Sequence, residues 1–121
     1  MEKNNAAKAD YRFGDWGPGY LICDDSSDLG AFRLRPGDSM VNHFHEHCDE
    51  TFVVLEGRCS VWIAEQDRIV LGANDVARCR PGEHHFVVND FDAPFLGIFI
   101  KSPSSPGDTI NVPWTPPGFQ Q

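Results

Sequence analysis

The chain has 121 residues, which fit one domain, and its 40% hydrophobic and 12% aromatic content can form a core, which excludes global disorder. A formal net charge of −8 argues against nucleic-acid and anionic-membrane partners, which both need a basic face. No segment approaches the ~20 apolar residues of a membrane span. Four cysteines without CxxC spacing, after a polar N-terminus, predict reduced thiols in a cytoplasmic protein.

The chain order predicts an N-terminal arm, a barrel and a Pro-rich tail. The arm covers residues 1–28, of which 13–20 are too rich in Gly and Pro for a long regular element. The tail covers 102–121. Between them, segments separated by turn signals predict short strands at 29–34, 40–45, 51–55, 59–64, 68–71, 75–79, 86–88 and 94–100.

These strands, with no helical periodicity, predict an all-β sandwich or barrel over residues 29–101. Residues 51–55 are apolar on both sides of the strand. Such a strand is covered on both faces, here by the barrel interior and by an arm or a second subunit. Together with the tryptophans in both arms, it predicts a homodimer.

A candidate metal site lies at residues 43–50. Because a strand has a period of two, His43 and His45 point to one face and Phe44 to the other. After a turn, Glu50 opens an antiparallel partner strand. Imidazole and carboxylate ligands suit Zn, Mn, Fe, Ni or Co better than Ca or Mg. A fourth ligand comes from His84 or His85, and spacing from the first three residues leaves that choice open.

Other histidine arrangements are weaker. His47 sits in the turn and is expected to face solvent or to support a ligand from outside the metal sphere. A site built from His45, His47 and Cys48 is cramped, and its thiolate would favour structural zinc.

The spacing of these residues resembles the two motifs of the cupin superfamily. The first motif is filled in every slot, by Gly37, His43, His45, Glu50 and Gly57. The second is filled by Gly82, His85 and Asn89, with departures at Asn74, where a Gly belongs, and at Arg80, where a Pro belongs. Asn tolerates a left-handed backbone, so the first departure is mild.

The resemblance covers residues ~30–100 and implies the fold and the ligand set. The implied fold is a double-stranded β-helix, the jelly-roll β-barrel of RmlC-like cupins. The implied ligands of one divalent transition metal are His43, His45, Glu50 and His85, the last chosen by its spacing from Gly82 and Asn89.

Two further groups are candidates for substrate binding. Arg33 and Arg35, and likewise Arg78 and Arg80, each share one face of a strand. They form either ion pairs on a solvated barrel face or a clamp for a substrate carboxylate or phosphate. Phe52 shares the face of Glu50 and is expected to line the cavity below the metal.

The predicted function is a metal-dependent enzyme that acts on a small oxygenated metabolite, a sugar-derived or keto acid, by redox-neutral isomerase or lyase chemistry, with Glu50 as the base. The alternatives are a non-haem Fe(II) dioxygenase and a non-catalytic metal- or ligand-binding cupin. Thiol dioxygenation is disfavoured because that cupin group often has a pocket tyrosine, whereas Tyr11 and Tyr20 fall in the arm.

Overall fold

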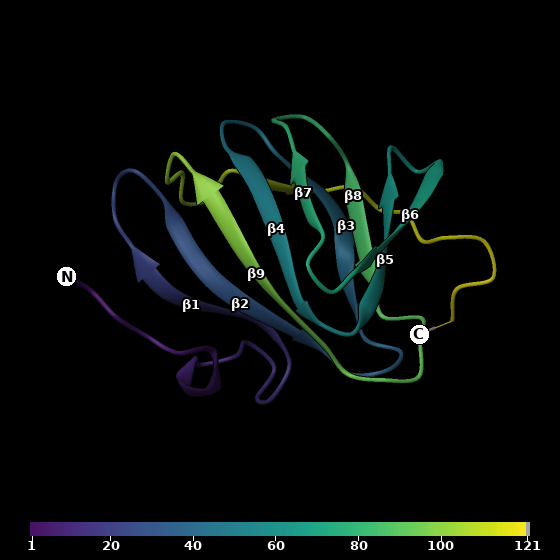
Figure 1. Cartoon of the computed structure of the whole chain (residues 1–121). Coiled ribbons are helices and arrows are strands. Elements are labelled where there is room, and N and C mark those ends of the chain that lie inside the picture. The colour runs from purple at the N-terminus through teal and green to yellow at the C-terminus, as the bar shows by residue number, and fades with distance from the viewer. Residues whose placement is uncertain (121) are drawn as a thin grey trace.

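The computed structural model describes residues 1–120 as two β-sheets that face each other (Figure 1). A three-residue 3₁₀ helix, η1 (Ala6–Lys8), precedes the strands, and no helix within this range can span a membrane. The strands are β1 (Gly17–Cys23), β2 (Asp28–Leu34), β3 (Ser39–His45), β4 (Asp49–Glu56), β5 (Arg58–Ile63), β6 (Asp67–Gly72), β7 (Val76–Cys79), β8 (His85–Val88), β9 (Phe95–Ser102) and β10 (Thr109–Asn111).

The strand order is β1-β2-β9-β4-β7 in one sheet and β10-β3-β8-β5-β6 in the other, and all pairings are antiparallel. This is the all-β, double-stranded jelly-roll architecture that the sequence predicts. Each of the eight strands expected between residues 29 and 100 is present, with ends that differ by at most two residues.

The two sheets enclose one hydrophobic core, because alternate residues of each strand point inward. On β2, Phe32 and Leu34 are inward and almost fully buried, and Phe52 and Val54 occupy the same face of β4. Phe32 packs against Phe52 and Phe95, with ring centroids 5.5 and 5.0 Å apart. This apolar packing fixes the frame on which the polar residues of the barrel are placed.

The turns explain the small residues of the sequence motifs. Gly57 has φ +77°, and a Cβ there would collide with the carbonyl oxygen of Pro94. Asn74 has φ 74°, which confirms that the residue standing in a glycine slot adopts the left-handed backbone expected of it.

The two arms differ from their predicted form. Residues 17–23, expected to be irregular over most of their length, form β1 and pair with β2. The sequence pattern did not predict this strand because its glycines and proline break the alternation of apolar and polar residues. Gly19 is needed because Ala9 and Tyr11 pack closely against it. In the tail, β10 pairs with β3, so the barrel extends beyond both 29 and 101.

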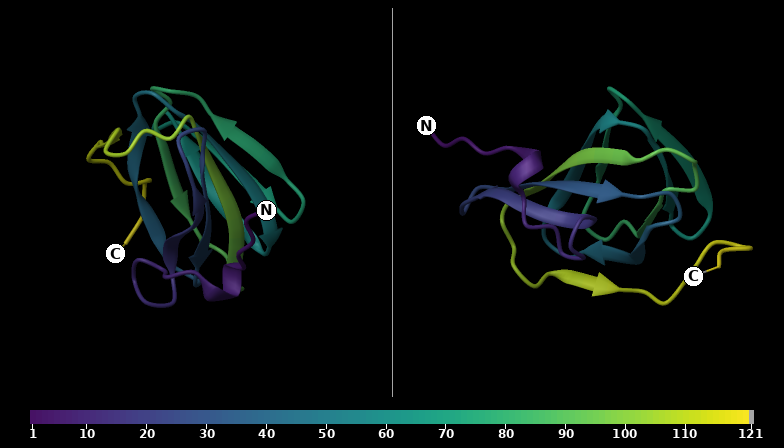
Figure 2. Two further views of the ribbon diagram at one scale, coloured as in Figure 1. Left: turned by 90° about the vertical axis from the view of Figure 1, so that its left-hand side faces the viewer. Right: turned by 90° about the horizontal axis from the view of Figure 1, so that it is seen from below.

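The ends of the chain cover the outer faces of the sheets. The C-terminal segment runs along the outside of the second sheet (Figure 2), where Trp114 and Phe119 pack on Phe86. Trp114 also contacts Trp62. At the other sheet, Tyr11 is buried beneath Arg33, whose guanidinium lies 4.6 Å from the ring centre.

Candidate metal centre

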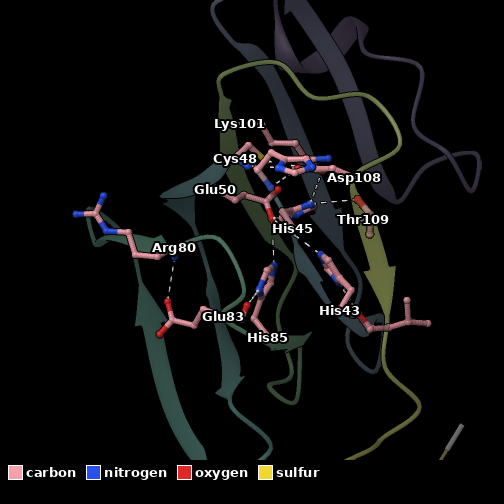
Figure 3. Close-up of polar contacts among 12 residues, drawn as sticks. His43, His45, Cys48, Glu50, Arg80, Glu83, His85, Lys101, Asp108 and Thr109 are labelled. Carbon is pink, nitrogen blue, oxygen red and sulfur yellow. Dashed lines mark hydrogen bonds and ion pairs between the residues drawn. The ribbon is translucent and has the colours of Figure 1, made fainter.

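Four side chains converge at one end of the barrel, and they are the four that the sequence singled out. His43, His45, Glu50 and His85 each offer a ligand atom, and these atoms lie within 4.8 Å of one another. Oε1 of Glu50 is 3.0 Å from Nε2 of His45, 3.1 Å from Nε2 of His85 and 4.0 Å from Nε2 of His43. Figure 3 shows the three imidazoles directed at the carboxylate.

Neighbouring strands bring these residues together. His43 and His45 occupy one face of β3, and the β3–β8 register places His85 opposite His43. Glu50 lies at the start of β4 in the facing sheet. His84 points elsewhere: it stacks on Phe44 and bonds to Glu65 at 2.7 Å. The structure thus brings His85, and not His84, to the other three residues.

The outer nitrogens of all three imidazoles are occupied. Nδ1 of His43 lies 2.7 Å from the carbonyl oxygen of Val41, and Nδ1 of His85 lies 2.9 Å from that of Glu83. A carbonyl oxygen can only accept, so each Nδ1 carries the hydrogen and each neutral ring presents a lone pair on Nε2. Nδ1 of His45 lies 3.3 Å from Oδ1 of Asp108.

Neutral imidazoles in these tautomers would point lone pairs at a carboxylate oxygen, which is also an acceptor. Acceptors at 3.0 and 3.1 Å are repulsive unless a proton or a metal cation lies among them. Burial, followed by the charge of His85, lowers the pKa of His43 to about 4. Burial would raise the pKa of Glu50, but hydrogen bonds from His45 and His85, which those rings can donate only when Nε2 carries a proton, hold it well below its usual range. The donor set therefore fits a cation.

His85 supplies a proton when no metal does. Burial would lower its pKa, but contacts with Cys79 and Glu50 reverse the effect, and the pKa is raised. A proton on His85 then faces Glu50 in the position where a cation would compete for the same lone pair.

A cavity of about 440 Å³ opens over the four residues. Phe52 lies in its wall as predicted, together with Phe32 and Phe99. Tyr20, expected in the N-terminal arm and not in the pocket, lies on β1 and also lines the cavity, so the reason given against thiol dioxygenation no longer holds. Lys101 and Arg12 supply the positive charge of the lining.

The four arginines that were candidates for substrate binding lie outside the described lining of this cavity, which favours the ion-pair alternative over the substrate clamp. Arg35 pairs with Asp38 at 2.9 Å, and Arg80 with Asp49 at 3.2 Å. In Figure 3 the guanidinium of Arg80 points away from the cluster. Arg33 covers Tyr11, and Arg78 donates to Thr51 at 2.8 Å. Alternation places Arg33 and Arg78 on the outer faces of β2 and β7, and Arg35 and Arg80 are exposed one residue beyond the ends of these strands. Ion pairing and packing occupy all four.

Asp108 is one of the residues near the site that sequence reasoning missed. It accepts hydrogen bonds from the backbone N–H groups of His47 and Cys48, at 3.0 and 3.2 Å, while facing His45. It follows a Ser- and Pro-rich stretch that carries no periodic signal. Its carboxylate fixes the tail against the turn that carries the metal motif.

The alternative site of His45, His47 and Cys48 is not formed. The side chain of His47 is 68% exposed, as expected for a solvent-facing turn residue, whereas Cys48 is buried. Burial, and then Asp108, raise the pKa of Cys48 to about 12, so this thiol stays protonated.

Fold and site together define a small double-stranded β-helix protein with a His₃Glu cluster in its cavity. The family Cupin_2, Cupin domain, matches residues 30–101, and the chain belongs to this family.

Individual proteins are also similar to this chain, in sequence or in structure. The chain is 27% identical over 81 residues to the tetracenomycin polyketide synthase protein TcmJ of Streptomyces glaucescens, covering 67% of this chain and 54% of TcmJ. It thus spans about half of that relative. An uncharacterised double-stranded β-helix protein of Klebsiella pneumoniae has a TM-score of 0.83 at 19% identity, covering 94% of this chain and 99% of that one. The polyketide cyclase RemF of Streptomyces resistomycificus has a TM-score of 0.80 at 20% identity, covering 95% and 87%.

Proposed function

We propose that the chain is a metal-dependent cupin enzyme that acts on a small oxygenated metabolite by redox-neutral isomerase- or lyase-type chemistry. The observation that carries this is the set of three Nε2 atoms and one carboxylate oxygen aimed at a common point, with each Nδ1 held from outside. Buried acceptors arranged in this way need a proton or a cation among them, and a divalent metal is the one species that all four can bind at once.

His43, His45, Glu50 and His85 would hold one divalent transition metal, chosen from Zn, Mn, Fe, Ni or Co. Such a metal supplies Lewis acidity that polarises a carbonyl or stabilises an enolate. Glu50 was predicted to double as the base, but a carboxyl with a lowered pKa is a poor proton acceptor at neutral pH. In this proposal Glu50 is therefore a ligand.

The similarity to RemF, named as a polyketide cyclase, supports chemistry without net oxidation, because ring closure within one substrate needs no external oxidant. TcmJ is named as a polyketide synthase protein, and the shared segment is about half of it. The positive charge in the cavity, from Lys101 and Arg12 in place of the four arginines, supports an acidic substrate.

Metal analysis of the protein, purified without added metal, tests the first half of the proposal. We expect near-stoichiometric transition metal in the parent and a strong loss of metal in His45→Ala. This variant should stay folded, because the apolar core of the barrel is unchanged. His47→Ala is the matched control, since that neighbouring imidazole is exposed. Equal metal occupancy in the parent and in His45→Ala, with both folded by circular dichroism, would refute the ligand assignment.

Turnover tests the second half. Keto acids and β-dicarbonyl compounds are incubated with the metal-loaded protein in D₂O, and exchange at the carbon beside the carbonyl is followed by NMR while an electrode records oxygen. Metal-dependent exchange without oxygen uptake is the expected result. Stoichiometric iron with substrate-dependent oxygen uptake would establish the dioxygenase instead, and an inert metallated protein would establish a binding module.

A further inference from the structure

Lys101 is a cation placed inside the cavity by the β-sheet register. It is the Cα partner of Glu50 in the β4–β9 pairing, and it shares the inward face of β9 with Phe99. Its Nζ donates to Oη of Tyr20 at 2.9 Å. Figure 3 shows Lys101 beside the cluster that contains Glu50 and His45.

The ammonium group of Lys101 has donors to spare. An ammonium has three N–H groups, and within residues 1–120 Tyr20 is its single hydrogen-bond acceptor. Burial would lower the pKa of Lys101, but the nearby charge of Glu50, followed by the hydrogen bond to Tyr20, raises it. Glu50 acts on Lys101 through its charge and accepts no hydrogen bond from it, so a bound anion would add a direct partner for the remaining N–H groups. Tyr20 holds the amine in place, because the aromatic ring packs edge-on against Phe99 at 5.2 Å.

The charge balance of the cavity favours an anion although the whole chain carries −8. Among the described lining residues, Lys101 and Arg12 are the permanent cations and Glu50 is the one acid. Glu50 is engaged with the imidazoles of His45 and His85, so its charge is not available to a ligand. Arg12 is exposed at the cavity rim, whereas Lys101 lies deeper.

The apolar part of the wall favours a flat molecule. Phe32, Phe52, Phe99 and Tyr20 contribute four aromatic rings to a cavity of about 440 Å³, a size typical of small-ligand sites. Aromatic walls stack on planar ligands and offer few partners to the hydroxyl groups of a sugar.

We infer that the cavity recognises a planar, unsaturated anion, a phenolate, enolate or arene carboxylate, whose negative oxygen accepts a hydrogen bond from Lys101. The ring of this ligand lies against the phenylalanine wall. This deepens the proposed function, since it takes the cavity as the substrate site of that enzyme, and it replaces the sugar-derived acid of the sequence prediction by a conjugated one.

Calorimetric titration of the protein as purified with benzoate, benzamide and gluconate tests this inference. These probes are a planar anion, its neutral analogue and a non-planar acid. Lys101→Met should weaken benzoate binding by about tenfold, equivalent to about 1.4 kcal/mol, and leave benzamide unchanged. Lys101→Arg retains most of the affinity because it retains the charge. Lys3→Met is the matched control, an exposed lysine of equal charge.

Equal benzoate affinity in the parent and in folded Lys101→Met would overturn the inference, as would the absence of any benzoate binding. Gluconate binding as tight as benzoate would overturn the planar part. His45→Ala separates this result from the proposed function. If that variant loses metal and still prefers benzoate to benzamide, the Lys101 site stands on its own. If the parent contains metal and turns over substrate without any effect of Lys101→Met, the enzyme proposal survives and this inference fails.

Discussion

The two ends of the barrel use the same inward strand faces for opposite purposes. Along β4 the inward side chains run from Glu50 through Phe52 to Val54, from a carboxylate to an aliphatic group. Along β8 the inward face passes from His85 to Val87. One end is closed by apolar packing, and the other end gathers ligand atoms around a cavity. Strand alternation determines which residues point inward. The type of side chain at each inward position then determines whether it joins the hydrophobic core or the polar cluster.

The difference has an energetic meaning. At the closed end, Leu34, Val54 and Phe95 are less than 2% exposed or close to it, and burial of their surface stabilises the fold. At the open end, His45 and His85 are equally buried, at 2% and 1%, but their lone pairs meet a carboxylate. Stability should therefore depend on the closed end, and metal binding on the open end. Substitutions at each end can separate the two.

The largest expected effect on folding is at the closed end. Leu34→Ala removes a side chain that is 1% exposed and should lower the free energy of unfolding by about 2–5 kcal/mol. Leu34 is outside the described cavity lining, so metal content measured below the melting temperature should not change. Chemical denaturation and metal analysis check both. Val70→Ala, at a position 43% exposed, is the control and should cost about 0.5 kcal/mol or less. A loss of metal in folded Leu34→Ala would show that the two ends are coupled.

The closed end could be predicted from the sequence because it depends on local periodicity and turn residues. The strands between residues 29 and 100 and the left-handed turn at Asn74 follow from such signals. So does the convergence of His43, His45 and Glu50, since two of them share one strand and the third opens the next. The strands β1 and β10 were missed because Gly, Pro and short length weaken periodicity.

Most of the rest of the open end could not be predicted, because it depends on contacts between distant segments. Asp108 contacts His45 although the two are 63 positions apart in the sequence, and no local sequence pattern predicts this contact. The choice between ion pairs and a substrate clamp for the arginines stayed open, because a basic pair on one strand face does not tell which partners the fold brings to it. Lys101 could have been found: it continues the inward alternation of Phe95, Gly97 and Phe99 on a strand that was predicted.

The next effect concerns the open end and the group that orients it. Asp108→Asn keeps an acceptor for the backbone N–H groups of His47 and Cys48 but removes the charge that faces Nδ1 of His45. Metal affinity should fall by about 10–100-fold, the range for groups that support a ligand without binding the metal. Competition with a chelator of known affinity measures this change.

Asp92→Asn, at an exposed aspartate, is the matched control for Asp108→Asn and should leave the metal affinity unchanged. Because folding depends mainly on the closed end, the free energy of unfolding of metal-free Asp108→Asn should change less than that of Leu34→Ala. An unchanged metal affinity in Asp108→Asn would mean that the tail holds the turn but does not support the ligand.

The smallest effect on the folded chain is expected on the outer face of the first sheet. The homodimer was predicted from the two-sided strand and the tryptophans, but Trp114 and Trp16 pack on their own barrel. What remains is the outer face of β4 and β7, where Leu55 is 50% and Val76 is 66% exposed. The N-terminal arm covers the neighbouring part of this sheet at Tyr11 and leaves these residues open.

We expect a dimer at micromolar concentration by light scattering, in which a second copy covers Leu55 and Val76. Val76→Lys should give a monomer, because a charge there would be buried between two copies. The same change at a position already 66% exposed should alter the stability of the monomer by about 0.5 kcal/mol or less. Val70→Lys, on the outer face of the other sheet, should remain dimeric. A parent chain that is already monomeric at these concentrations would refute the predicted dimer. The conclusions about the closed core and the metal end would be unaffected, because one chain supplies all the residues of both.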